Sequence, residues 1–117
     1  MSKVTIYHNP RCSKSRATLA LLEEKGQSIN VIEYLDTPPT LKILDAVCAQ
    51  LGLEPLELIR TKESLFKELG LSKKDQRSRR EWLSLMVNNP KLIERPIVLK
   101  GGKAALGRPP ESVLDIL

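Results

Sequence analysis

The fold is decided by residues 3–34, KVTIYHNPRCSKSRATLALLEEKGQSINVIEY. Apolar residues alternate with other side chains over residues 3–7, a period-two pattern that predicts a first strand. Asn9-Pro10 ends this strand, and residues 13–25 then carry the apolar face of a helix. Residues 29–34 are rich in β-branched side chains and predict a second strand. A strand, a helix and a strand in this order form a βαβ unit, with parallel strands and a right-handed crossover.

The rest of the chain completes an α/β fold around this unit. Residues 38–92 contain several short helical patterns, including one that ends near Arg60, and no convincing strand. Two β-rich runs then flank Gly101-Gly102, which predicts a tight antiparallel hairpin, and a last helix covers residues 111–117. The order βαβ–ββα predicts a thioredoxin-like fold with a four-stranded mixed sheet. We therefore expect one domain over residues 1–117, with a helical insertion at about residues 38–92.

Composition and charge limit the kinds of partner. The chain has 117 residues, a formal charge of +5 and a pI of about 9.4, which suits an anionic ligand. Aromatic residues make up only 3% of the chain, so stacking platforms for nucleic acid are scarce. No signal sequence and no apolar run of ~20 residues is visible, which predicts a cytoplasmic protein without a membrane segment. Two cysteines and one histidine give neither a disulfide framework nor an ordinary zinc site, so we expect no metal.

Cys12 is the residue with the clearest chemistry. It lies between the first predicted strand and the first predicted helix, where free N–H groups and the helix dipole stabilise a thiolate. Arg11, Lys14 and Arg16 add positive charge, and His8 would add more if it were protonated. The alternative is a small apolar residue that fills a gap, but these neighbours do not form an apolar pocket. We expect a reactive thiolate nucleophile.

The other residues near this thiol leave alternatives open. Ser15 follows Cys12 in a C-x-x-S motif, where its hydroxyl could bond the thiolate, cap the helix, or do both. His8 could tune Cys12 or could simply be a histidine held at the end of a strand. Cys48 shares an apolar helical face, so burial is expected; the alternative is a resolving thiol for Cys12. Because position 15 is not cysteine, an external thiol must complete any redox cycle.

These residues resemble the glutaredoxin-coupled arsenate reductases, and the likeness covers essentially the whole chain. The loop His8–Arg16 is similar to the active loop of that family. Further matching segments follow in the family's order: residues 34–39, Arg60, residues 68–70, 89–90, 94–98, 107–109 and 113–117. The resemblance implies that Cys12 is the nucleophile and that Arg60, Arg95 and Arg108 bind the oxyanion. It also implies that His8, Asn9 and Ser15 organise the loop and lower the pKa of the thiol.

The resemblance also implies a reaction. Arsenate would be reduced to arsenite by the Cys12 thiolate, with glutathione as co-substrate, glutaredoxin as the protein partner and no bound cofactor. Three guanidinium groups suit a tetrahedral oxyanion, and proline after Arg95 and Arg108 restricts both arginines to extended backbone. Thioredoxin-like folds also carry a cis proline before the third strand, which predicts a cis bond at Pro96. Two alternatives are a thiol transferase for glutathione mixed disulfides and a non-catalytic RNA polymerase-binding regulator, whose relatives typically carry C-x-x-C.

Overall fold

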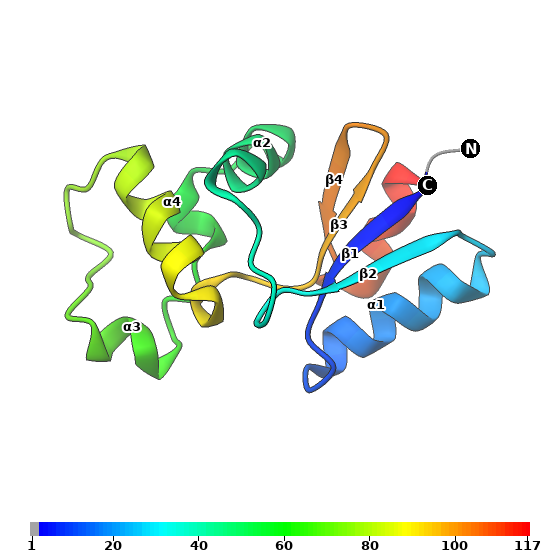
Figure 1. Cartoon of the computed structure of the whole chain (residues 1–117), viewed down its shortest axis with the longest axis horizontal. Helices are drawn as coiled ribbons and strands as arrows, with labels where there is room; N and C mark the ends of the chain where they lie inside the picture. Colours follow the sequence, from blue (N-terminus) through cyan, green and yellow to red (C-terminus); the bar gives the residue numbers. More distant parts are fainter. Residues whose placement is uncertain (1–2) are drawn as a thin grey trace. The chain divides into compact units, whose positions relative to one another are not determined.

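The computed structural model describes residues 3–117 and divides the chain into two compact units (Figure 1). One unit contains the chain up to Thr37 together with Arg95–Leu117, and the other is Pro38–Glu94. The chain therefore leaves the first unit at Pro38 and returns to it at Arg95. No helix within residues 3–117 is long and apolar enough to cross a membrane.

The first unit is built on a four-stranded mixed sheet in the order β2-β1-β3-β4. Strand β1 (Val4–His8) pairs in parallel with β2 (Ile29–Glu33), and antiparallel with β3 (Ile97–Lys100) on its other side. The Gly101-Gly102 turn joins β3 to β4 (Lys103–Leu106), and both glycines have positive φ, as the tight hairpin requires. The predicted α/β, thioredoxin-like fold is confirmed.

Helix α1 (Ser13–Glu24) and the 3-10 helix η3 (Pro110–Ile116) cover one face of this sheet (Figure 1). Their side chains meet those of β1, β3 and β4 in a common core of Val4, Ile6, Leu22, Val98, Ala105 and Val113. The apolar positions of β1 are spaced by two residues, which places them on the same face of the strand. This core fixes α1 against β1 and so fixes the loop between them.

The second unit is helical, as the sequence predicts. It contains α2 (Leu41–Leu51), η1 (Pro55–Leu58), α3 (Ser64–Glu68), α4 (Arg79–Asn88) and η2 (Pro90–Leu92). Helix α4 begins at the predicted capping box, in which Ser78 and Glu81 satisfy each other's backbone N–H groups. Helices α2 and α4 contact each other, and the fully buried residues of this unit include Leu44, Leu58, Leu83, Met86 and Leu92.

One predicted helix end in this unit is wrong. The short helix that begins at Pro55 ends at Leu58 instead of near Arg60. Ile59 leaves the helix to form an isolated antiparallel bridge with Ile93. The backbone N–H of Arg60 then donates to the carbonyl of Leu92 at 2.7 Å. The backbone N–H of Arg60 thus bonds a distant segment and not the preceding helical turn.

Candidate active site

Cys12 is the N-cap residue of α1, at the end of the turn that follows β1. Its backbone N–H donates to the carbonyl of Asn9 at 3.0 Å, and its own carbonyl accepts from Arg16 N–H at 3.0 Å. The side chain of Asn9 accepts from Arg11 N–H at 3.0 Å, which tightens the same turn. Cys12 makes no side-chain cap, so its sulfur is available to the free N–H groups of the first helical turn.

The surroundings of Cys12 favour its thiolate. Burial raises the pKa of the thiol, whose residue is only 8% exposed. Hydrogen bonds from the backbone N–H groups of Ser15 and Lys14, together with the charge and a hydrogen bond of Arg95, outweigh this effect. The pKa of Cys12 therefore lies below its ordinary value, and a thiolate is the nucleophilic form of cysteine.

The cation that acts on Cys12 comes from a distant segment of the sequence. Sequence reasoning assigned this effect to the loop cations and to a protonated His8. Instead, Arg16 donates to the carbonyl of Pro10 at 3.0 Å, and Arg95 is the residue whose charge lowers the pKa of Cys12. Pairing of β3 with β1 brings the Arg95 segment back to the end of the first strand.

His8 and Ser15 form a buried pair beneath the loop. The Nδ1 atom of His8 lies 2.6 Å from Oγ of Ser15, and both residues are buried. The same hydroxyl accepts from the backbone N–H of Asn9 at 3.0 Å. Burial, with the charge of Arg16, lowers the pKa of His8 despite the opposing charge of Glu33, so the imidazole is neutral at pH 7. His8 therefore adds no positive charge to Cys12 at neutral pH.

The Ser15 hydroxyl takes neither of the roles that the sequence left open for it, a bond to the Cys12 thiolate or a helix cap, because it bonds His8 and Asn9. Ser15 is the third residue of α1, and its side chain points back to His8 and Asn9, which leaves Cys12 as an N-cap without a side-chain bond. The backbone N–H of Ser15, and not its hydroxyl, is the group of this residue that lowers the pKa of Cys12. Ser15 therefore links the end of β1 to the first turn of α1 and holds the loop that carries the thiol.

Two of the three predicted oxyanion ligands lie together in the first unit. Nη1 of Arg108 donates to the carbonyl of Arg95 at 3.3 Å. The peptide bond between Arg95 and Pro96 is cis, as predicted, and the bond between Arg108 and Pro109 is also cis, which the sequence did not predict. The two arginine segments are joined by the Gly107 N–H, which donates to the carbonyl of Pro96 at 3.0 Å.

Gly107 and Thr18 make a close contact that the sequence did not reveal. A Cβ atom at position 107 would overlap the side chains of Thr18 and Pro96, so only glycine fits. The buried Thr18 hydroxyl donates to the carbonyl of Lys14 at 2.8 Å and faces the carbonyl of Gly107 at 3.4 Å. Helix α1 thereby packs directly against the segment that carries Arg108.

Arg60 and Cys48 belong to the second unit. Nη1 of Arg60 forms an ion pair with Glu63 at 3.0 Å and donates to the carbonyl of Lys91 at 3.3 Å. The role of Arg60 as an oxyanion ligand stays a prediction. Cys48 is fully buried, and burial raises the pKa of its thiol, which agrees with the expected unreactive residue.

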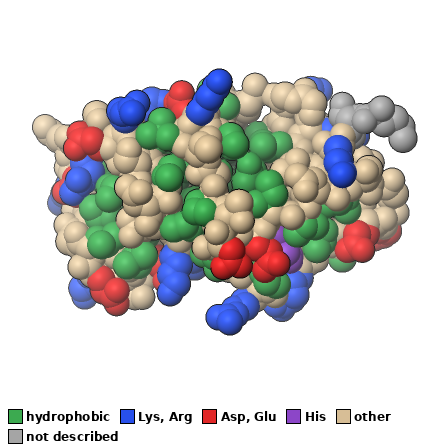
Figure 2. Space-filling view, viewed as in Figure 1, with side chains coloured by type: hydrophobic (Ala, Val, Ile, Leu, Met, Phe, Trp, Pro, Cys, Tyr) green, Lys and Arg blue, Asp and Glu red, His purple; other side chains and the backbone are tan. Residues whose placement is uncertain are grey.

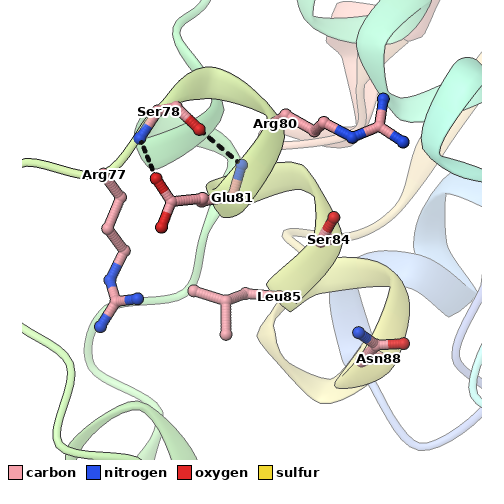
Figure 3. Close-up of a pocket in the computed structure, with 7 residues that line it drawn as sticks. All are labelled: Arg77, Ser78, Arg80, Glu81, Ser84, Leu85 and Asn88. Atoms are coloured by element: carbon pink, nitrogen blue, oxygen red, sulfur yellow. Dashed lines mark hydrogen bonds between the residues drawn. The ribbon is translucent and has the colours of Figure 1, made fainter.

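A pocket of about 310 Å³ lies beside the Cys12 loop within the first unit. It is lined by His8, Asn9, Pro10, Arg11, Glu33, Leu35 and Asp36. A second hollow, of about 360 Å³, lies along α4 in the other unit, between Arg77, Arg80 and Asn88 (Figure 3). The residues that line this second hollow include no cysteine and no histidine, whereas the first pocket is lined by residues of the loop that leads to Cys12. Within residues 3–117, no three His, Cys, Asp or Glu side chains are grouped as a metal site would require.

The site is a cysteine of lowered pKa at the first turn of α1 in a thioredoxin-like fold, and full-length relatives named arsenate reductase place the chain in the class of oxidoreductases. The chain belongs to the ArsC family, which it matches over residues 7–116.

Individual relatives agree along the full length of the chain. The arsenate reductase of Neisseria meningitidis serogroup B is 48% identical over 118 residues, which cover 100% of both chains. The uncharacterized protein YfgD of Escherichia coli is 51% identical over 116 residues, covering 98% of this chain and 97% of its own. The solved arsenate reductase from Vibrio cholerae is 52% identical, with a TM-score of 0.92 over 99% of this chain and 98% of its own.

Proposed function

We propose that this chain reduces arsenate to arsenite, with Cys12 as the nucleophile and with glutathione and glutaredoxin as the reductants. The observation that carries the proposal is the position of Cys12 as the N-cap residue of α1, where the backbone N–H groups of Ser15 and Lys14 and the charge of Arg95 lower the pKa of its thiol. The Cys12 thiolate would act as the nucleophile, and the Arg95 guanidinium next to it would bind the negative charge of the substrate. The arsenate reductase names of full-length relatives support the choice of oxyanion.

In the first step, the Cys12 thiolate attacks arsenic(V). A sulfur–arsenic bond forms, one hydroxyl of arsenate leaves as water after it takes up a proton, and arsenic remains in the +5 state. Arg95 and Arg108 hold the negative oxygens while the charge redistributes, because guanidinium groups donate paired hydrogen bonds to oxyanions. Arg60 is proposed as the third donor.

Glutathione then supplies the second thiol. Its sulfur attacks the arsenic, a second water leaves, and arsenic(V) is now bound to both Cys12 and glutathione. The glutaredoxin thiol attacks the glutathione sulfur, and a mixed disulfide between glutaredoxin and glutathione forms. The electron pair of the broken arsenic–sulfur bond stays on arsenic, which becomes arsenic(III). Hydrolysis of the remaining bond to Cys12 releases arsenite and restores the thiol.

External thiols are needed because the chain offers no second accessible thiol. Ser15 stands where a C-x-x-C motif would place one, and its hydroxyl is engaged by His8 and Asn9. Cys48 is fully buried on α2. A dithiol–disulfide cycle within one molecule would require this helix to open, whereas glutathione and glutaredoxin can reach the thiol from solution.

The test is arsenate-dependent consumption of NADPH, coupled through glutathione reductase, glutathione and glutaredoxin. The wild type is expected to turn over, Cys12→Ser is expected to be inactive, and Cys48→Ser is the matched control that keeps activity. If the wild type is no faster than Cys12→Ser, arsenate is not the substrate. A parallel assay with a glutathione mixed disulfide in place of arsenate tests the thiol transferase alternative. Turnover of the mixed disulfide without turnover of arsenate would support that alternative.

A further inference from the structure

The pocket beside the Cys12 loop has an arrangement of charges that the oxyanion chemistry does not use. It is formed at the carboxyl ends of the parallel strands β1 and β2, where His8 and Glu33 are paired neighbours. Ligands of open α/β sheets bind at this end of parallel strands. After β2, the backbone N–H of Asp36 donates to the carbonyl of Glu33 at 3.0 Å, and this turn brings the second carboxylate to the pocket.

Both signs of charge face this pocket. Its lining includes the carboxylates of Glu33 and Asp36 and the guanidinium of Arg11, together with the neutral imidazole of His8 and the side chain of Leu35. None of these three charged side chains forms an ion pair within residues 3–117. In Figure 2, acidic side chains (red) lie next to the histidine (purple) at the surface of the molecule. Unpaired charges of both signs around one pocket complement a zwitterion better than a simple anion.

The pocket is also directly adjacent to the nucleophile. Arg11 precedes Cys12 in the chain, so their Cα atoms are ~3.8 Å apart. The carbonyl of Asn9, another lining residue, accepts from the Cys12 N–H at 3.0 Å. A thiol co-substrate that forms a bond to the arsenic on Cys12 must place its remaining atoms close to this loop. The volume of about 310 Å³ is at the lower end of small-molecule pockets, which span ~300–1,000 Å³.

We propose that this pocket binds the γ-glutamyl end of glutathione, with Glu33 and Asp36 binding its α-ammonium group and Arg11 its α-carboxylate. The inference rests on the proposed function, because it concerns the thiol that the second step consumes. The two ends of glutathione differ in charge: the γ-glutamyl end carries an ammonium and a carboxylate, whereas the glycine end carries only a carboxylate. Two acidic side chains repel the glycine end, so the charges of the pocket select the orientation of the tripeptide.

The first experiment measures binding without catalysis. S-methylglutathione, whose thiol is blocked, is titrated into the full chain, and backbone amide shifts are followed by NMR. Shifts are expected at Asn9, Arg11 and Asp36. The double variant Glu33→Gln/Asp36→Asn is expected to bind roughly three- to tenfold more weakly, because it removes both charges that would bind the ammonium group and exposed ion pairs contribute modestly to affinity. Glu23→Gln, an exposed carboxylate on α1, is the matched control and should bind like the wild type.

The identity of the bound end is tested with a shorter ligand. N-acetyl-S-methylcysteinylglycine lacks the γ-glutamyl group and carries no ammonium, so the wild type and the double variant should bind it equally. Shifts confined to other parts of the chain, equal affinity of the wild type and the double variant for S-methylglutathione, or no binding to the wild type would each overturn the inference. The substituted side chains are exposed, and both replacements keep their size, so the fold should be unaffected.

Steady-state kinetics provide the second readout. In the coupled assay, the double variant should raise the KM for glutathione by the same three- to tenfold and leave the KM for arsenate unchanged. An equal rise in both constants would contradict a role specific to glutathione. Absence of arsenate turnover in the wild type would refute the proposed function alone, and the binding titration would still decide whether this pocket takes glutathione.

Discussion

Replacement of Ser15 by alanine is expected to lower the free energy of unfolding by about 2–3 kcal/mol. The substitution removes one hydroxyl that bonds two groups, Nδ1 of His8 at 2.6 Å and the N–H of Asn9 at 3.0 Å. A buried polar group left without its partner costs ~1–3 kcal/mol. His8 is only 6% exposed and is expected to carry most of this cost, whereas Asn9 is partly exposed and can be rehydrated. For a chain of this size, the melting temperature should fall by roughly 8–12 °C.

Urea denaturation followed by circular dichroism measures this loss. Ser13→Ala is the matched control, because it removes the same hydroxyl from an exposed position in the same helical turn. Both substitutions raise the helix propensity by the same amount, because each replaces serine by alanine. The difference between their free energies of unfolding therefore measures the contribution of the buried hydrogen bonds of Ser15. The control should change stability by less than ~0.5 kcal/mol. If Ser15→Ala is as stable as Ser13→Ala, the hydroxyl does not hold the loop, and the account of its role is refuted.

Three further perturbations test the fold around the site. Gly107→Ala should lower the free energy of unfolding, measured by urea denaturation, by ~1–3 kcal/mol, because the new methyl group overlaps the side chain of Thr18. The loss should be smaller in a Thr18→Ala background. An equal loss in both backgrounds would contradict this contact. Because burial lowers the pKa of His8, only the unfolded chain binds a proton just below pH ~6.5, so stability should fall as the pH falls below that value. His8 is the only histidine, and an NMR titration midpoint at or above ~6.5 would show that the sign is wrong. Thr40→Ala removes the side-chain cap of α2 and should lower the free energy of unfolding, measured by thermal denaturation, by about 1 kcal/mol. Thr37→Ala, outside the helix, should lower it little. Equal losses in the two variants would show that the Thr40 cap does not stabilise α2.

The sequence predicted the features that depend on local pattern. The alternation in β1, the glycine pair before β4 and the capping box of Ser78 each have a short-range physical cause, and all three are present. The position of Cys12 before a helix was also readable, because a strand, a Pro-containing turn and an amphipathic helix follow directly in the chain.

The missed features depend on contacts between distant segments or on the direction of one side chain. Arg95 reaches Cys12 because β3 pairs with β1, and charge counting in the loop cannot show this. From the sequence, the Ser15 hydroxyl could face the sulfur of Cys12 or the end of β1. Its direction depends on the angle between β1 and α1, which the sequence does not show. The only indication of the contact between Gly107 and Thr18 in the sequence is the glycine that precedes Arg108-Pro109.

The most direct test of the central claim is the alkylation rate of Cys12 as a function of pH, measured in a Cys48→Ser background. The rate should rise with a midpoint below the ~8.5 of an ordinary cysteine. Arg95→Gln should move the midpoint to higher pH, whereas Arg16→Gln, which removes a loop cation bonded to Pro10, should move it less. A wild-type midpoint at or above ~8.5 would contradict an activated nucleophile at Cys12.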